Sequence, residues 1–495
     1  KKGFAYRQEA AMNEKYKMRL GKFLILILAA AGILWISMFF LRQYTARESV
    51  ASGSARIVYG TSSYTRPDKS HLATDRETNI EYIDNELLAW KRDDMPENEF
   101  KAYLEEHHME IVGKMSSISL YQLRLEGTYS YERLMELAAQ MTEQKAAKSA
   151  GPNITCGIVS GSRSEETGSV GTEALEWLPW GLQAVEMEGA WSLTKGIEKK
   201  INVGVLDTGF FTEHEDLVFA ETPLANSLYD EDGKIESHGT HVAGILAASS
   251  DPDKGICGAI PLDQRNLYGA SVFGMRIDRD RVDFMGLGTA LNYLIAQKNC
   301  SLICFGKEEM IKEMNGENPN GEALVPRLEE LLEGFLEKGC DFVICKAAGN
   351  QKEVDASWDP FAAIESPRVR ERILVTGAAA GEDGRLFLAD YSSPGQRVDL
   401  AAPGGIEDDI ISTGVQPGFF QIPQSGFVGM SGTSMAAPYV SGAAALVWLA
   451  DPELTGAQVK EILCDTADIP LENCSGRKLL DAAKAVETAI NEKNK

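Results

Sequence analysis

The hydrophobic positions of this chain follow three patterns. Phe23 to Leu41 is an unbroken apolar stretch, FLILILAAAGILWISMFFL. Between residues 80 and 147, apolar positions switch between strand-like alternation and helical spacing. From residue 176 to about 490, short β-rich apolar runs alternate with helical segments, which predicts a mostly parallel sheet covered by helices on both faces. The pattern therefore predicts a membrane segment, a small α+β domain and a large α/β domain.

The stretch 23–41 is long enough to cross a bilayer as a helix. Residues 1–22 carry a net charge of +5, which favours a cytoplasmic amino terminus. A cleaved signal peptide is the alternative, but its apolar region is usually shorter and ends in a small-x-small site, where this chain has Arg42-Gln43-Tyr44. We therefore predict an uncleaved transmembrane anchor, followed by a polar linker at 42–79 and by domains outside the cytoplasm.

Residues 80–147 have the order strand–helix–strand–strand–helix, which is most of a split βαβ unit. The expected strands are Asn85–Lys91, Glu110–Met115 and Ser119–Leu125, and the expected helices are Pro96–His108 and Tyr131–Gln144. No carboxylate or cysteine spacing around His107 and His108 supports a metal site. The segment 148–175 is rich in Gly, Ser and Thr and is expected to be an exposed connector.

Charge and cysteine content narrow the function. The net charge of −24 argues against binding to nucleic acid, because that needs a basic surface. The eight cysteines form no C-x-x-C pair, so a zinc ribbon or thioredoxin motif is not indicated. Cys464 and Cys474 are close enough in sequence to form a bridge, but the sequence does not decide the pairing.

The stretch Gly429–Leu449, GMSGTSMAAPYVSGAAALVWL, predicts a buried helix that is apolar on all sides. Ser434 lies at its amino end, where free backbone N–H groups and the helix dipole favour negative charge. A nucleophilic serine needs that setting because its reaction passes through an oxyanion. By itself the stretch also fits a core helix capped by Ser and Thr.

Two further segments carry polar residues at predicted strand or helix ends. Asp207 follows the apolar strand 201–206, and functional groups of open α/β sheets lie beyond such carboxyl ends. His238 lies at the entry of a helix that continues through Val242. The order Asp207, His238, Ser434 is one of the known orders of a serine-hydrolase triad. A zinc site at His238 and His241 is the competing interpretation, but no glutamate stands in the H-E-x-x-H arrangement.

Three motifs together resemble those of the subtilisin-like serine peptidases. They are Asp207-Thr208-Gly209, the run from His238 to Gly244 (HGTHVAG), and the run from Gly432 to Pro438 (GTSMAAP). The strand that ends at Asn350 (FVICKAAGN) and the segment Leu400–Gly404 (LAAPG) agree with the same family. The resemblance covers about residues 176–487 and implies a three-layer subtilisin-like α/β fold.

The resemblance also implies a role for each site residue. Ser434 is the nucleophile, His238 the general base, Asp207 its orienting carboxylate and Asn350 an oxyanion donor. The chain departs from the family at residues 302–306, where Asn-x-Ser-x-Gly is usual, and at Lys346 and Tyr439. The first departure affects the substrate groove, so no cleavage preference is predicted.

By the same resemblance, the domain at 80–147 is similar to the inhibitory propeptide of the family, and the processing site is expected in the connector. No cofactor is expected for catalysis. Asp216 lies nine residues after Asp207, where relatives place a calcium ligand, and the loop 249–255 offers further oxygens. A structural calcium ion is therefore a secondary expectation.

The sequence thus predicts a membrane-anchored, self-processing serine endopeptidase that acts on proteins or peptides at the cell membrane, with release after processing left open. Its partners are its substrates, its own propeptide as an intramolecular inhibitor, and the membrane. The alternative is a catalytically silent relative that serves as a binding or scaffold protein at the cell surface.

Overall fold

The computed structural model describes residues 56–157, 167–170, 178–223, 226–229, 234–249, 255–260, 269–277, 281–306, 318–417, 423–474, 476 and 478–494. The predicted basic segment 1–22 and anchor 23–41 lie outside these residues. Residues 56–495 form a single compact unit.

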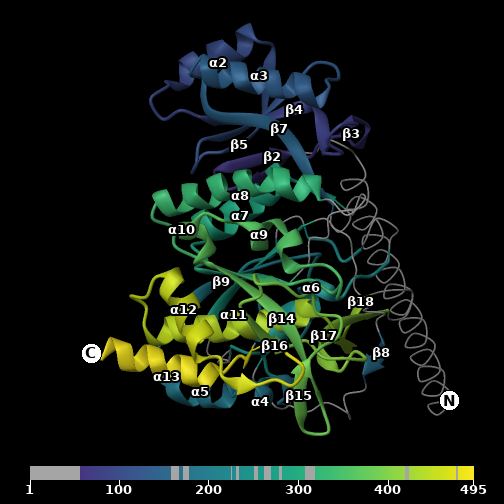
Figure 1. The fold of residues 1–495 in the computed structure, drawn as a ribbon, viewed down its shortest axis with the longest axis vertical. Coiled ribbons are helices and arrows are strands. Elements are labelled where there is room, and N and C mark those ends of the chain that lie inside the picture. The colour runs from purple at the N-terminus through teal and green to yellow at the C-terminus, as the bar shows by residue number, and fades with distance from the viewer. Residues whose placement is uncertain are drawn as a thin grey trace, which may run out of the picture. The chain divides into compact units, whose positions relative to one another are not determined.

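A nine-stranded sheet forms the centre of the larger domain (Figure 1). Its strands run in the order β10 (Gly269–Arg276), β9 (Lys200–Asp207), β12 (Leu302–Phe305), β13 (Val343–Ala347), β14 (Ile373–Glu382), β16 (Leu400–Pro403), β20 (Lys478–Leu479) and β19 (Ile469–Pro470), with β15 (Arg385–Leu388) beside β14. All pairs are parallel except those made by β15 and β19. The predicted mostly parallel α/β sheet is confirmed.

Helices cover both faces of this central sheet. On one face lie α5 (Met187–Thr194), α6 (His238–Ala247), α11 (Thr433–Ala450), α12 (Gly456–Thr466) and α13 (Ala482–Lys493), packed against strand residues such as Val203, Cys304 and Cys345. On the other face lie α7 (Phe284–Asn292), which runs on into one turn of π-helix η3 (Tyr293–Gln297), and α8 (Pro319–Glu337), packed against Ile303, Phe305 and Ile344. Neighbouring residues of β12 thus enter different cores, as strand alternation requires.

Shorter elements complete the domain. They are α4 (Trp180–Ala184), η4 (Ala356–Trp358), α9 (Pro360–Ala363), α10 (Pro367–Arg370) and a small antiparallel sheet of β17 (Ile410–Pro417), β18 (Pro423–Met430) and β8 (Thr167–Val170).

The helix α11 confirms the buried helix predicted from Gly429–Leu449. Every one of its residues is buried, including Pro438 within it. Among the described residues it is the one helix long and apolar enough to cross a membrane, but its burial inside the protein makes it a core helix. The predicted membrane anchor is a different segment and stays a prediction.

The amino-terminal domain has the ferredoxin-like order β5-β6-β4-β7 within its sheet. Its elements are β4 (Glu81–Lys91), α2 (Glu97–Glu106), β5 (Met109–Met115), β6 (Leu120–Leu125), α3 (Tyr131–Glu143) and β7 (Ala147–Gly157). The sheet is extended by β1 (Arg56–Tyr59), β2 (Ser62–Thr65), β3 (Leu72–Thr74) and, from the larger domain, β11 (Arg281–Asp283). The short helix η1 (Lys69–His71) lies between β2 and β3 in the chain. The three strands and two helices predicted for residues 80–147 are present.

The predictions of a linker at 42–79 and of a connector at 148–175 were wrong in part. Residues 56–74 are not linker, because β1, β2 and β3 pair with β2, β5 and β4. Residues 148–157 are not connector, because β7 pairs along β4, and Thr167–Val170 form β8 beside β18. In both places, pairing with other strands outweighs the tendency of a sequence rich in Gly, Pro, Ser and Thr to be irregular.

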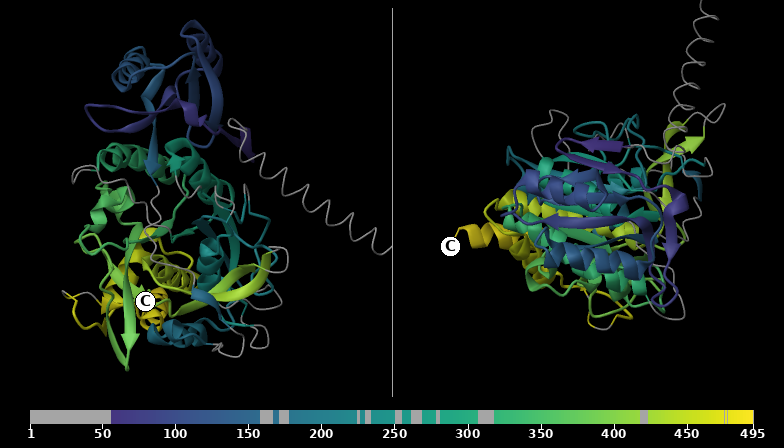
Figure 2. Two further views of the ribbon diagram at one scale, coloured as in Figure 1. Left: turned by 90° about the vertical axis from the view of Figure 1, so that its right-hand side faces the viewer. Right: turned by 90° about the horizontal axis from the view of Figure 1, so that it is seen from above.

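The two domains share one hydrophobic core. Leu88, Trp90 and Leu120 of the amino-terminal sheet belong to the same buried cluster as Phe284 of α7 and Leu328 of α8. The other face of that sheet packs against α2 and α3. Figures 1 and 2 show the resulting layers, with α7 and α8 between the two sheets.

Candidate active site

Three neighbouring parallel strands end at the same edge of the central sheet. Asp207 is the last residue of β9, Gly306 directly follows β12, and Asn350 lies three residues after β13. The carboxyl ends of such strands form the site-bearing edge of an open α/β sheet. The sheet therefore places the two predicted residues, Asp207 and Asn350, at one edge.

Asp207 holds His238 by a hydrogen bond. The Nδ1 atom of His238 lies 2.7 Å from Oδ1 of Asp207, and the Asp207 side chain is completely buried while that of His238 is 19% exposed. The same Oδ1 accepts the backbone N–H of Thr208 at 2.7 Å and the Thr208 hydroxyl at 3.3 Å. Because a carboxylate can only accept here, Nδ1 carries the proton and Nε2 is left with a free lone pair.

A glycine allows this contact. His238 is the first residue of α6, and Gly239 follows it. A Cβ on Gly239 would lie 2.3 Å from the carbonyl oxygen of Gly209 and 3.1 Å from Cβ of Asp207. Only glycine therefore lets the start of α6 approach the end of β9 closely enough for the hydrogen bond.

The head of α11 lies against Asn350. Ser434 is the second residue of that helix and is 5% exposed, after Gly432 at φ 158°. The Asn350 side-chain oxygen accepts the Thr433 backbone N–H at 2.8 Å and the Thr433 hydroxyl at 3.0 Å. In turn Thr433 Oγ1 accepts the N–H of Gly349 at 3.1 Å. These bonds fix the Asn350 amide so that its N–H₂ group faces away from Thr433.

The nucleophile candidate and the histidine come from helices that pack together, α11 and α6. Among the described residues no hydrogen bond joins His238 to Ser434. Such bonds are often long in an enzyme without substrate. Gly306 lies between the two helices, since a Cβ there would be 3.1 Å from both the Ser434 carbonyl oxygen and Val242.

The zinc interpretation does not fit His241. Its Nε2 lies 2.9 Å from the Ile410 carbonyl and 3.1 Å from that of Val428, so this nitrogen carries a proton that it donates. Burial lowers the pKa of His241 to about 3, which keeps the imidazole neutral. In the described part of the chain, no group of three or more His, Cys, Asp or Glu side chains is arranged to hold a metal ion.

Asp216 lies apart from these residues. It is buried, its Oδ2 accepts the Ile256 N–H at 3.2 Å, and its backbone N–H donates to Nδ1 of His214. Burial raises the pKa of Asp216, and the Ser249 hydroxyl and the Ile256 N–H oppose this shift. Its contacts are thus with the ends of the loop 249–255 and not with Asp207 or His238.

The departures from the family pattern have structural partners. The wholly buried Lys346 forms a 2.8 Å ion pair with Asp359 and lies over the ring of Phe305, 4.9 Å from its centroid. Asp359 also caps α9, accepting the N–H of Phe361 at 2.9 Å. Tyr439 fills the space beside Gly181. Cys464 is a free thiol, so the conceivable bridge between Cys464 and Cys474 is not formed.

Sequence reasoning did not single out the residues that hold the site together. Thr208 lies inside a recognised motif beside Asp207, which it supports, and Thr433 lies inside another motif beside Ser434, although it supports Asn350. Their positions in these motifs were their only signal. Asp359 had no signal, because nothing near it in sequence indicates that it pairs with Lys346.

Comparison with known proteins agrees with this geometry. The sequence model of the Subtilase family matches residues 198–492. The major intracellular serine protease of Bacillus subtilis is 31% identical over 277 residues, covering 54% of this chain and 75% of that protein. Subtilisin Savinase of Lederbergia lenta is 29% identical over 315 residues, covering 62% of this chain and 98% of its own.

Among solved structures, fervidolysin of Fervidobacterium pennivorans, described as a keratinolytic enzyme related to subtilisin, has a TM-score of 0.55 at 18% identity. The likeness covers 85% of this chain and 65% of that one, and it shows the fold. The family match spans more than half of the chain, over the residues that build the edge described above. The chain therefore belongs to the subtilase family and is a serine-type endopeptidase.

Proposed function

We propose that Asp207, His238 and Ser434 act as the catalytic triad of this endopeptidase. Ser434 attacks the peptide carbonyl, His238 Nε2 takes its proton and returns it to the leaving amine, and Asp207 stabilises the imidazolium. The observation that carries this proposal is the 2.7 Å bond between Asp207 and His238 Nδ1, which leaves Nε2 as the base. Thr208 supports the same carboxylate oxygen and so helps to hold the imidazole orientation.

Asn350 serves as the side-chain donor to the oxyanion. Its oxygen is bound by Thr433, so its N–H₂ group is held on the other side, and a Cβ on Gly432 would lie 3.2 Å from Nδ2. The backbone N–H of Ser434, at the amino end of α11, is the second donor. Because the donors are held before substrate arrives, they need no reorganisation during the reaction.

A fluorophosphonate probe tests the triad. Processed wild-type protein is expected to be labelled, and the Ser434→Ala variant is not. The matched variant Ser441→Ala removes another buried hydroxyl of α11, which donates to the Ala437 carbonyl and lies beside the thiols of Cys304 and Cys345, and it should retain labelling. Unlabelled, correctly processed wild type would instead favour the silent scaffold.

The amino-terminal domain acts as a propeptide that the enzyme removes from itself. Its sheet lies on α7 and α8, and its last strand β7 pairs with β11 of the larger domain, with Gly157 opposite Arg281. The end of β7 therefore lies beside a strand of the larger domain. The likeness to fervidolysin spans 85% of the chain, which is more than the family match alone.

Expression of wild type beside Ser434→Ala tests self-processing. The wild type is expected to shorten to a fragment that lacks the amino-terminal domain, whereas Ser434→Ala keeps its full length. Identical trimmed fragments from both would assign the cleavage to another protease.

Residues 23–41 anchor the precursor in the cell membrane with the amino terminus in the cytoplasm, and processing separates the enzyme from the anchor. The support is the uncharged apolar stretch behind a basic segment. Carbonate washing should leave Ser434→Ala precursor in the membrane and remove processed enzyme. Extraction of the precursor by carbonate would disprove the anchor.

A calcium ion bound by Asp216 would add structural stability. Oδ1 of Asp216 and the Ser249 hydroxyl are buried and have no hydrogen-bond partner among the described residues other than each other. A buried carboxylate oxygen beside a hydroxyl suits a hard cation. Calcium is expected to raise the melting temperature of Ser434→Ala above its value in EGTA, and Asp216→Asn should abolish that difference.

A further inference from the structure

The last strand of the amino-terminal domain is contacted along its length by polar residues of α8 and by Asp283, which ends β11 and caps α7. Ser149, Gly151 and Asn153 alternate along β7 and therefore lie on the same side of the strand. Glu330 of α8 bonds the Ser149 hydroxyl, the Arg327 guanidinium lies over Gly151, and Asp283 bonds Asn153.

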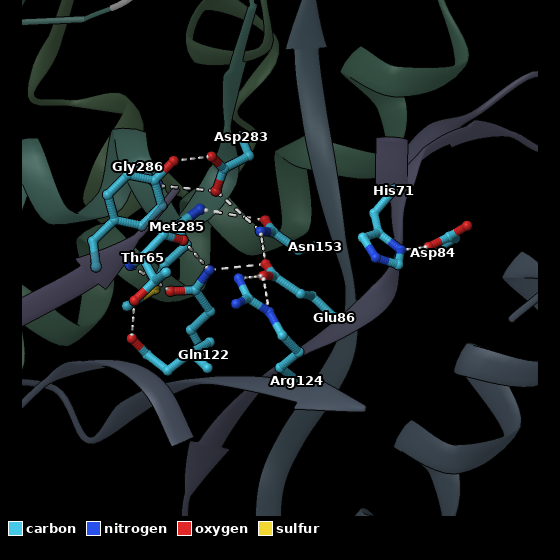
Figure 3. A network of polar contacts seen from close by, with 12 residues as sticks. Thr65, His71, Asp84, Glu86, Gln122, Arg124, Asn153, Asp283, Met285 and Gly286 are labelled. Carbon is cyan, nitrogen blue, oxygen red and sulfur yellow. Dashed lines mark hydrogen bonds and ion pairs between the residues drawn. The ribbon is translucent and has the colours of Figure 1, made fainter. Parts of the chain in front are cut away.

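Asn153 occupies the centre of this interface (Figure 3). Its Nδ2 donates to Glu86 Oε2 at 2.9 Å and to Asp283 Oδ1 at 3.0 Å. Its Oδ1 faces the backbone N–H of Met285 at 3.5 Å, in the first turn of α7. The side chain thus joins a carboxylate of its own domain to the amino end of an enzyme helix.

Both carboxylates are held from several sides. Glu86 also accepts from Gln122 at 2.8 Å and forms a 2.7 Å ion pair with Arg124. Asp283 also accepts from Tyr64 and from the N–H of Gly286 at 3.2 Å. The amide of Asn153 donates to both carboxylates.

Gly151 adds a steric restriction. A Cβ at that position would lie 2.1 Å from Nη2 of Arg327. If β7 slipped by two residues, either Ser149 or Asn153 would bring a Cβ to that place. A slip of one residue would turn Asn153 away from Asp283, since successive side chains of a strand point to opposite faces.

Asn320 fixes the strand near its end. It lies in the first turn of α8, and its amide accepts from the Glu81 N–H at 2.9 Å and donates to the Thr155 carbonyl at 2.6 Å. This side chain therefore bridges β4 and β7, two residues before β7 ends opposite Arg281.

We propose that this face of α7 and α8 sets the register of β7, with Asn153 as the positioning residue that determines which peptide bond the precursor presents to Ser434. The inference rests on the proposed self-processing. The contacts of Asn153 act through the strand and not on the reacting atoms. A role in setting the register is therefore detected from the position of cleavage as well as from its rate.

The full-length chain with Asn153→Asp tests this inference. The substitution places a third carboxylate between Glu86 and Asp283, and the loss of the shared donor is expected to slow processing roughly tenfold or more. It should also produce new amino termini, most simply displaced by two residues. Gln140→Glu is the matched control, because it adds the same charge on α3, and it should process as wild type. Time courses and mass spectrometry of the mature amino terminus give both readouts.

A second pair of variants separates register from folding. Asn153→Asp with Asp283→Asn exchanges the acid and the amide, and it should recover part of the rate and the original terminus. Gly151→Val changes no charge and should also displace the terminus. Melting of each variant in the Ser434→Ala background shows whether the precursor folds.

Three results would overturn the inference. If Asn153→Asp and Gly151→Val yield the wild-type terminus at the rate of Gln140→Glu, register is set elsewhere. If wild type is not processed, or Ser434→Ala is processed alike, self-processing itself fails and the inference fails with it. A variant that only slows processing, with an unchanged terminus and a precursor that no longer melts cooperatively, assigns Asn153 to stability and also overturns the register role.

Discussion

The two sheets of the molecule differ in what covers them. Helices of the larger domain cover both faces of the central sheet. The amino-terminal sheet packs one face on its own α2 and α3, and the other on α7 and α8 of the larger domain. The central sheet is therefore covered on both faces by helices of its own domain. The amino-terminal sheet buries one of its faces against helices of the larger domain.

Polar residues follow the same division. In the central sheet, Asp207 and Asn350 lie at or beyond strand ends, where helix termini and loops of the same domain bind them. In the amino-terminal sheet, Glu86 and Asn153 lie on the covered face, and Asn153 donates both to Glu86 and to Asp283 of the larger domain. Separation of the two domains would expose apolar side chains and also break this polar network.

The largest effect is expected from separating the domains. Leu88, Trp90, Met115, Ile118 and Leu120 bury their side chains in the shared core. At about 1.5–3 kcal/mol each, their exposure offsets most of the roughly 5–15 kcal/mol that stabilises a typical domain. Residues 56–157 alone should therefore give a circular dichroism spectrum of a largely unfolded chain.

Adding processed enzyme that has been inactivated with a fluorophosphonate should restore the folded spectrum of that fragment. A cooperative thermal transition of the isolated fragment, close to that of the full chain, would contradict the idea that its core is shared.

The next largest effect concerns a charge inside the central domain. Lys346→Ala would leave Asp359 buried without its cation, and loss of one partner of a buried pair costs about 3–5 kcal/mol. The matched control is Lys352→Ala, whose pair with Asp390 is exposed and should be worth about 0–1 kcal/mol. Urea unfolding in the Ser434→Ala background measures both changes. Equal small losses would show that the buried pair adds no stability.

The sequence predicted the edge of the central sheet well, and the reason is local. Asp207, His238 and Ser434 each lie in a short motif whose glycines, such as Gly239, are needed for close approach. The helix α11 was predictable because all its positions are apolar or small. The supporting contacts were not, since Asp359 is thirteen residues from Lys346 and no pattern joins them.

The amino-terminal sheet was predicted less completely. Strand β7 contains Gly151 and Pro152, which indicate a turn when read alone. It is a strand because β4 pairs with it, and because Arg327 of α8 occupies the space that a side chain at position 151 would fill. The pairing of Asn153 with Asp283 spans 130 residues, beyond the reach of any local pattern.

At the catalytic edge, Asn350→Ala should reduce kcat by about 10²–10³, or about 2.7–4 kcal/mol, as loss of the corresponding asparagine does in subtilisin. KM and melting temperature should change little if the side chain acts on the transition state, as proposed. Thr433→Val, which removes the hydroxyl that holds the Asn350 oxygen, should reduce kcat less. Steady-state kinetics on a peptide substrate measure both, and a change confined to KM would argue against an oxyanion role.

The smallest effect is a pH dependence of opposite sign in the two regions. His241 has an ordinary pKa of 6.5 that burial lowers to about 3, so between these pH values the unfolded chain binds a proton at His241 that the folded domain does not bind. Below pH 6.5 the free energy of unfolding should therefore fall by about 1.4 kcal/mol per pH unit because of this residue.

At the domain interface, burial raises the pKa of Glu86 and Asp283, so their contribution to stability strengthens as pH falls and weakens as pH rises. Denaturant unfolding of Ser434→Ala between pH 7 and 5 should show the loss, and His241→Gln should reduce its slope. If His241→Gln keeps the full slope, another group in the central domain takes up the proton, whereas dissociation of the amino-terminal domain at the lower pH would reverse the sign expected for the interface.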